Sequence, residues 1–338
     1  MNKHGSPWRL SVLPVAALAL IVMMAATACA EQARSGSPAL PPGFTDTPLP
    51  QVDVNGYVYV AQGSPLLVSA QSFGSQAPQE SDRDLSVKAS RLMAWLGPSA
   101  DLFGGRAQFA TSDDSELVLK RLTQEGAQDQ RVWAQQQGDS VLLVKGAGDW
   151  ATSLKEALLN NTNSTLKEKY PEVWELMELL PENPPNPPVA AGFLRELPTL
   201  VESLAGNRGL EIQGLQSALS FVKVESAAFA AYSQPMETLP AAELTAEELK
   251  QTGVGAVIVT KAGYPGFVVN MMLGSFASRA GLEEVSLGEE KVRYRVLDNR
   301  LHLMVRNFGS TLFIVAAPDR ETAEALTKAV LAQQAKGK

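Results

Sequence analysis

The chain has 338 residues, with 29 Lys and Arg against 36 Asp and Glu, and its net charge is −7. An acidic chain of this kind disfavours nucleic-acid binding, which requires a basic surface. The single Cys excludes a disulfide within the chain. His4 and His302 are the only two His, so zinc coordination and His-dependent catalysis have few ligands. We therefore expect a protein without a metal or another cofactor, stabilised by its apolar core.

The first 28 residues have the pattern of an export signal. Lys3 and Arg9 give a positive start, an apolar run follows over residues 10–24, and small residues occupy 25–28. Pro14 leaves about a dozen uninterrupted apolar residues after it, fewer than the roughly 20 of a membrane span. We expect the mature chain to begin after this signal and to work outside the cytoplasm.

Ala26, Thr27, Ala28 and Cys29 resemble the lipobox of bacterial prolipoproteins. The resemblance implies that Cys29 becomes the mature N-terminus, is diacylated and holds the protein on the cell membrane, in the periplasm or at the cell surface. The alternative is an ordinary small-residue cleavage site, which would release a soluble protein with a free thiol. Because the only Cys falls at this position, we favour lipidation. The mature chain then carries 27 basic and 36 acidic residues, a net charge of −9.

Composition divides the mature chain into four parts. Residues 29–50 are rich in Pro, Ser and Gly and are predicted to be a lipidated Cys followed by a flexible tether. Residues 51–180 are predicted to form one lobe and residues 191–334 a second. Between them, the sequence PENPPNPP at 181–188 breaks regular structure, so we predict a Pro-rich linker over 181–190.

In the first lobe we predict a hairpin whose turn is Asn55-Gly56, because this pair favours positive φ. A helix over residues 84–96, a strand over 106–111 and a helix capped by Asp113 follow. Strands over 131–137 and 140–145 flank the turn Gly138-Asp139. Asp149 is predicted to cap the next helix, and Pro171 to open the main helix of the stretch 166–180.

The second lobe is predicted to start with helices over 193–205 and 210–222 and a strand over 227–233. Thr245 and Glu248 form a capping box, and a strand over 256–261 and a helix over 265–279 come next. Three strands over 291–297, 301–307 and 311–317 form a meander before a helix capped by Asp319. Residues 144–158 and 315–329 share one pattern: a strand, a short linker, a capping Asp and a helix. This indicates either a duplication or a strand-to-helix connection that is common in proteins. The fold class predicted is α+β, with two lobes of mixed β-α-β-β-α type, mainly antiparallel sheets and helices packed on one face.

The sequence contains little evidence for a catalytic site. Two Ser-x-x-Lys matches, at residues 164–167 and 220–223, occur at about the frequency expected by chance, and no partner motif accompanies them. The acids Asp113, Asp114 and Glu116 are explained by a helix N-terminus. The apolar helix that contains Phe267 and Met271 fits a lipid-facing surface or, more commonly, packing on the sheet.

The meander offers one candidate binding surface. Pairing its first two strands across Asp298-Asn299 places Val296 opposite Leu301 and Arg295 opposite His302, with the apolar side chains on the other face. Like charges directly opposite each other cost stability, so a basic face in an acidic protein suggests an anionic ligand. The alternative is that nearby Glu residues neutralise this face. The candidate ligand-binding residues are Lys291, Arg293, Arg295, Arg300, His302 and Arg306.

Our leading hypothesis is a non-catalytic, membrane-anchored lipoprotein that binds or scaffolds another envelope component, either an anionic one or a protein. The second hypothesis is a carrier or receptor for a small ligand or lipid held between the lobes. The third is a hydrolase that uses two carboxylates brought together by the fold.

Overall fold

The structure is a computed structural model. It describes residues 38–47, 49–67, 89–99, 101–126, 132–160, 163–197, 224–234, 253–297 and 301–336. Several predicted features lie outside the described residues: the lipidation site Cys29, the capping box of Thr245 and Glu248, the helix over 210–222, and Arg300.

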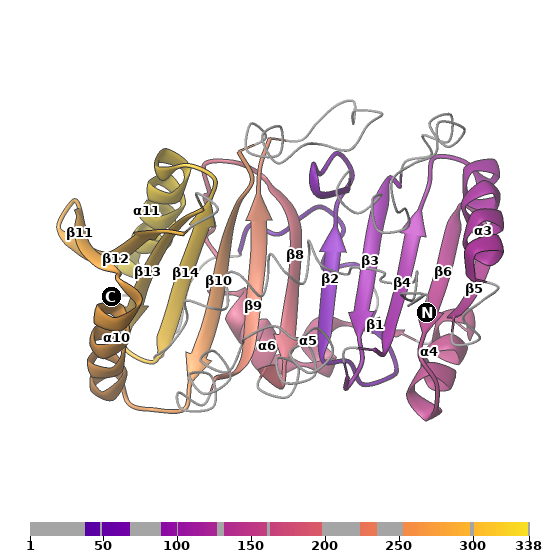
Figure 1. The fold of residues 1–338 in the computed structure, drawn as a ribbon, viewed down its shortest axis with the longest axis horizontal. Coiled ribbons are helices and arrows are strands. Elements are labelled where there is room, and N and C mark those ends of the chain that lie inside the picture. Colours follow the sequence, from indigo (N-terminus) through magenta and orange to yellow (C-terminus); the bar gives the residue numbers. More distant parts are fainter. Residues whose placement is uncertain are drawn as a thin grey trace, which may run out of the picture.

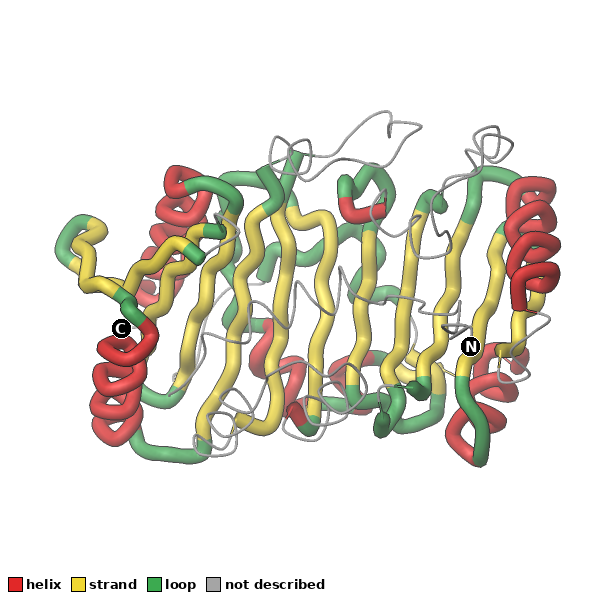
Figure 2. Tube along the Cα trace, in the orientation of Figure 1, coloured by secondary structure: helices red, strands yellow, loops and turns green. Residues whose placement is uncertain are grey.

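Twelve of the described strands form one antiparallel sheet, shown in Figures 1 and 2. Their order is β11-β12-β13-β14-β10-β9-β8-β2-β3-β4-β6-β5. The predicted α+β class with an antiparallel sheet is confirmed. The strands are β2 (Gly56–Val60), β3 (Arg91–Leu96), β4 (Phe103–Gln108), β5 (Val132–Gln137), β6 (Ser140–Lys145), β8 (Pro188–Arg195), β9 (Val224–Tyr232), β10 (Gly255–Ala262), β11 (Glu283–Leu287), β12 (Glu290–Val296), β13 (His302–Phe308) and β14 (Thr311–Ala317).

Helices cover both faces of this sheet. One face, here called the α6 face, packs against α4 (Asp149–Asn160), α5 (Leu166–Lys169), α6 (Pro171–Met177) and α11 (Arg320–Lys336). The opposite face, called the α10 face, packs against the inner side of α10 (Gly266–Ala280). The helix α3 (Ser112–Gly126) lies on the α10 face as well. Gln136 of β5 donates to Ser115 of α3. Across the paired strands, Gln136 shares its face with Val141, Ala107 and Leu92, and Leu92 packs against the core of the α10 face. The prediction placed helices on one face, and the structure adds α3 and α10 on the other.

The chain follows one path twice. In the first half, β4 leads through α3 to the edge of the sheet, and β5 and β6 return until β6 pairs with β4. In the second half, β10 leads through α10 to the opposite edge, and β11 to β14 return until β14 pairs with β10. An α-helix, α4 or α11, follows each returning strand. The shared plan predicted for 144–158 and 315–329 is therefore the last part of a longer common path.

The two halves meet through hydrogen-bonded strands. β8 pairs with β2 of the first half and with β9 of the second, so the sheet is continuous across the predicted boundary. Gly192 allows this close packing, because a Cβ there would overlap the carbonyl oxygen of Tyr57 and the ring of Phe229. β8 begins at Pro188, so the predicted linker ends in a strand, and the predicted start of a helix at 193 is wrong. The division into two lobes itself stays a prediction.

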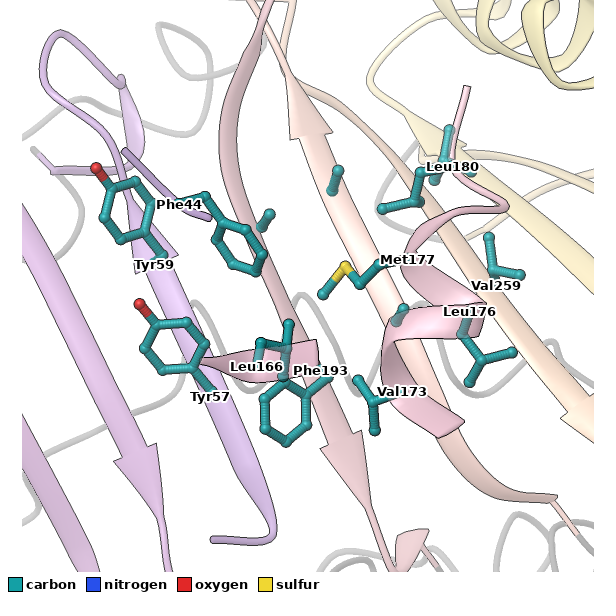
Figure 3. Packing of buried hydrophobic residues seen from close by; sticks show 14 of the residues in the cluster. Phe44, Tyr57, Tyr59, Leu166, Val173, Leu176, Met177, Leu180, Phe193 and Val259 are labelled. Atoms are coloured by element: carbon teal, nitrogen blue, oxygen red, sulfur yellow. The ribbon is translucent and has the colours of Figure 1, made fainter. Parts of the chain in front are cut away.

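The segment before β2 is packed on the sheet, which corrects the prediction of a tether as far as residue 50. Phe44 is 2% exposed, and its ring centroid lies 5.8 Å from those of Tyr57 and Tyr59. Figure 3 shows the three rings on the same side of the sheet. Leu49 is 1% exposed, and the short strands β1 (Leu49–Pro50) and β7 (Asn163–Ser164) pair with each other. Composition alone suggested a spacer because Pro and Gly dominate this stretch, but its two large apolar side chains anchor it.

Two other predictions are corrected by non-local packing. The predicted helix over 84–96 ends instead in β3, where Met93 and Trp95 enter the α6 face and Leu92 and Ala94 the α10 face. Both faces are covered, so the strand does not alternate between apolar and polar residues. Asn55 and Gly56 do not form a hairpin turn. Gly56 begins β2, where a Cβ would come within 2.8 Å of side-chain atoms of Leu194 and Leu96.

Candidate functional site

The helix α10 and the strands β11 to β13 occupy one end of the sheet, at the left of Figure 1. Pro265 precedes α10, and Gly281 ends it in the left-handed conformation with φ 65°. The guanidinium of Arg295 lies beside this C-terminus, 3.9 Å from the position of a Cβ on Gly281, where a helix dipole favours a cation. At the other end of α10, Gly266 rests against Gly309 in the turn between β13 and β14. Both ends of α10 are thus fixed to the sheet.

The two sides of α10 differ sharply. Val269, Leu273 and Ala277 are buried in the core of the α10 face, together with Leu303 and Val305 of β13. Phe267 is 77% exposed and Met271, one turn later, is 69% exposed. We call these two side chains the outer surface of α10. The predicted packing of this helix on the sheet is therefore correct for its inner side only.

The basic residues predicted for the meander meet acidic partners. Lys291 and Arg293 of β12 form ion pairs with Glu284 of β11, with nitrogen–oxygen distances of 2.8 Å and 3.3 Å. Arg306 of β13 pairs with Glu290 at 2.6 Å and donates to the carbonyl oxygen of Lys291. These pairs correspond to the alternative given above, in which nearby Glu residues neutralise the basic residues. Sequence reasoning missed the strand β11, which supplies Glu284.

The predicted register of the first hairpin of the meander is wrong by one residue. Val296 pairs with His302, not with Leu301, and Arg293 pairs with Val305. The amide of Leu297 donates to the carbonyl oxygen of Leu301, so three residues rather than two connect the strands. A shift of one residue moves every side chain of a strand to the other face.

The six basic residues therefore do not form one surface. Lys291, Arg293 and Arg295 share the α10 face with Leu303 and Val305. His302 and Arg306 share the α6 face with Tyr294 and Met304, and Tyr294 Oη lies 2.8 Å from His302 Nδ1. Arg300 lies outside the described residues. The structure brings together Lys291 and Arg293 through Glu284 and separates them from His302 and Arg306.

The pKa of the Glu284 carboxyl is lowered. The hydrogen bond from Lys291 is the largest cause, and the charges of Lys291, Arg293 and Arg306 add to it. Glu284 therefore stays ionised at lower pH than an isolated Glu. Its charge is compensated by Lys291 and Arg293, so these two cations are engaged in ion pairs within the hairpin.

A second polar cluster lies where β2 begins. The Tyr170 hydroxyl donates to Asp53 at 2.7 Å and accepts from the amide of Val54 at 2.8 Å. Arg195 pairs with Asp53 at 3.2 Å and lies over the ring of Tyr170, with its Cζ 4.3 Å from the ring centroid. Burial raises the pKa of the Tyr170 hydroxyl. Every partner in this cluster holds residues 53–54 against α6 and β8, which indicates a structural role.

Other groups singled out in the sequence are used locally. Thr111, not Asp113, caps α3: its hydroxyl accepts from the amide of Asp114 and donates to the Asp114 carboxylate. Lys167 of the first Ser-x-x-Lys match lies over the ring of Trp174, at 5.8 Å, and in the described part of the chain no hydrogen bond joins it to Ser164. The second match is outside the described residues.

The described part of the chain contains neither a group of three His, Cys, Asp or Glu residues able to bind a metal nor a helix long and apolar enough to cross a bilayer. A shallow hollow of about 370 Å³ lies between the segment 38–45 and α6. In its wall, the indole N–H of Trp174 already donates to Glu178 at 2.6 Å.

The fold and this end of the sheet define a class: a single-sheet antiparallel α+β protein with helices on both faces. No protein-family model and no curated protein matches the chain. Among solved structures, crystal forms I, III and IV of TP0453 are similar, with TM-scores of 0.38, 0.41 and 0.36. Sequence identities are 6%, 8% and 6%, over 85%, 83% and 83% of this chain and 99%, 98% and 97% of those chains. At these values the similarity carries no argument about function.

Proposed function

We propose that the chain is an exported bacterial lipoprotein, anchored outside the cytoplasm by a lipid on Cys29. Its folded part binds or organises another envelope component without catalysis. The observation that carries this proposal is Cys29 itself, which is the only Cys in 338 residues and directly follows an apolar run and a small-residue tail. A single Cys at this position serves as an attachment point for lipid.

The packing of the N-terminal segment supports a short anchor. The amide of Ala39 donates to the carbonyl oxygen of Pro181, and Phe44 is buried, so the packed chain begins close to residue 38. Eight residues, 30–37, then separate Cys29 from residue 38, and this stretch spans at most about 30 Å. A lipid on Cys29 would hold the sheet close to the bilayer surface.

Three acidic groups in the described part of the chain take part in structural contacts. The pKa of each of the Asp139, Glu168 and Glu284 carboxyl groups is lowered, chiefly by hydrogen bonds from Gln108, Thr165 and Lys291, respectively. A hydrolase with two carboxylates would instead need one acid with a raised pKa, because that acid must donate a proton near neutral pH.

The junction of the two halves gives no support to a ligand carrier on the α6 face. Val173 and Met177 of α6 are buried on this face together with Phe193 of β8 and Ala228 of β9, as Figure 3 shows for the labelled residues. The small side chains of β8 and β9 are thus covered by a helix of the same chain. Side chains occupy the place where a ligand between the lobes would bind on this face.

The test is intact-mass measurement and membrane fractionation of the full chain expressed in a bacterium, beside the variant Cys29→Ser. We expect the wild-type protein to start at Cys29, to carry a diacylglyceryl group and to sediment with membranes. The variant should lack the lipid mass. A wild-type protein that starts at Cys29 without added lipid and stays in the soluble fraction would overturn the proposal.

A further inference from the structure

We propose that the outer surface of α10 is a second membrane contact, which docks on an anionic phospholipid surface. This inference rests on the proposed function, because a lipid on Cys29 would bring the domain within reach of a bilayer. It adds a defined orientation, in which the α10 end of the sheet faces the headgroups.

The first observation is the exposure of large apolar side chains on a helix whose only charged residue is Arg279, close to its C-terminus. Phe267 and Met271 lie one turn apart and are 77% and 69% exposed. No charged residue occurs from residue 262 to residue 278, and a side chain added at Gly274 would meet open space. Single exposed apolar residues are common on soluble proteins, but a helix surface without any charge is unusual. Such a surface is typical of helices that lie in the interfacial layer of a membrane.

The second observation is that folding does not require this surface. Val269, Leu273 and Ala277 already bury the inner side of α10, and Met272 and Phe276 pack at its flanks. Phe267 and Met271 point away from that core, so polar residues in their place would leave the packing intact. Exposure of apolar area to water has a free-energy cost, which a contact with lipid removes.

The third observation is a local excess of positive charge. Residues 253–317, which include α10 and the strands β10 to β14, contain seven Lys and Arg and five Asp and Glu. The rest of the chain from residue 29 contains 20 Lys and Arg and 31 Asp and Glu. An anionic membrane therefore repels most of the protein and attracts this end, which turns α10 toward the bilayer.

A second copy of the chain fits this surface less well. Two large side chains, each partly exposed, offer on the order of 300 Å². A stable dimer needs about 800 Å² from each partner. A small apolar surface is sufficient for a membrane contact when a lipid anchor already keeps the protein at the bilayer, because the second contact is then intramolecular.

The experiment uses residues 29–338 with Cys29→Ser, which include every described element and have no lipid. Because Cys29 is the only Cys, Met271→Cys in this background gives a single site for a polarity-sensitive fluorophore. The matched control is Leu117→Cys, an apolar position on α3 that is 37% exposed at the other end of the sheet. Vesicles contain phosphatidylglycerol and phosphatidylethanolamine, or phosphatidylcholine alone.

We expect anionic vesicles to shift the emission of the label at 271 to shorter wavelength and to leave the label at 117 unchanged. Without a label, Phe267→Ser with Met271→Ser should lower partitioning onto anionic vesicles about tenfold or more, with unchanged circular dichroism. Equal responses at 271 and 117, or none, would overturn the proposal. The proposal would also be overturned if the emission of the label at 271 shifted on raising the protein concentration alone, without vesicles, since that outcome indicates binding of a second copy. An equal response to phosphatidylcholine would contradict the anionic preference. None of these readouts depends on lipidation of Cys29, so the two proposals fail separately.

Discussion

The two ends of the sheet follow the same chain path and present opposite surfaces. α3 and α10 each have 15 residues, each leads from an inner strand to an edge of the sheet, and both lie on the α10 face, at the right and left of Figure 1. Six of the 15 residues of α3 are charged, whereas α10 contains only Arg279. The same place in the fold therefore accepts a charged outer surface, and the uncharged surface of α10 has to be explained by something other than folding.

The two helices are also held in different ways. α3 is held by polar contacts. Ser115 is buried, and its hydroxyl donates to the carbonyl oxygen of Gly138 at 3.0 Å. The side-chain amide of Gln136 donates to the Ser115 hydroxyl at 2.7 Å. α10 is held by buried apolar side chains, with Leu273 at its centre. Stability at the α10 end therefore depends on burial, and at the α3 end on hydrogen bonds.

The largest expected effect follows from removing that burial. Leu273→Ala should lower the free energy of unfolding by about 2–5 kcal/mol, because it deletes a buried side chain and leaves a cavity. The shift of the midpoint in urea measures it. Gly274→Ala, on the outward side of the same helix, is the control: with open space around its Cβ it should raise stability by about 0.5–1 kcal/mol. A loss at position 274 as large as that at 273 would mean that α10 is covered on both sides.

At the α3 end, loss of the helix cap at Thr111 should lower the free energy of unfolding. Thr111→Ala removes the hydroxyl that accepts from the amide of Asp114, and should cost about 1 kcal/mol. Asp113→Ala, at the residue that the sequence suggested as the cap, should cost at most about 0.5 kcal/mol, since only its interaction with the helix dipole is lost. Urea unfolding of both variants distinguishes them. If Asp113→Ala were the more damaging, Thr111 would not be the cap of α3.

Some strands could be predicted from sequence more accurately than β3 and β8. β5, β6 and β14 are local hairpin strands with clear turn residues, such as Gly138 with φ 63°, and their bounds agree with prediction within a residue or two. β3 and β8 lie inside the sheet, and both of their faces are covered by distant parts of the chain. Burial on both faces removes the alternation from which strands are recognised. The segment around Phe44 was missed for a related reason, since its anchors contact residues of the sheet.

For the basic residues of the meander, the strand that carries each one could be predicted, but the face that it occupies could not. The basic residues of β12 and β13 were recognised, but which face each occupies depends on whether the connection after Leu297 has two or three residues. Nearby Glu residues were expected as partners, but β11, the strand that carries Glu284, was not predicted. Exposure of Phe267 and Met271 could not be predicted, because a periodic apolar helix gives no sign of which apolar side chains the sheet leaves uncovered.

The smallest expected effect concerns two carboxyl groups with a lowered pKa, one at each end of the sheet, whose pKa values are lowered by different causes. At the β5–β6 turn, the pKa of Asp139 is lowered chiefly by a hydrogen bond from the neutral amide of Gln108. At the other end, the pKa of Glu284 is lowered by Lys291 and by further cations. A lowered pKa means that each carboxylate stabilises the fold above its ordinary pKa, and that this contribution is lost as pH falls through the folded-state value.

Salt should distinguish the two. At about 0.5 M NaCl the Debye length falls to about 4 Å, so exposed ion pairs are weakened, but a hydrogen bond from a neutral amide is not. We expect the pKa of Glu284, followed by carbon-13 carboxyl NMR, to rise toward its ordinary value while that of Asp139 stays low. Glu284→Gln should lower the melting temperature at pH 7 by at most about a degree, and its difference from the wild type should vanish in acid, where the wild-type carboxyl is protonated. Equal salt responses at both sites would mean that the β11–β12 hairpin is held by hydrogen bonds, like the opposite end, and that its cations do not set the charge of the surface beside α10.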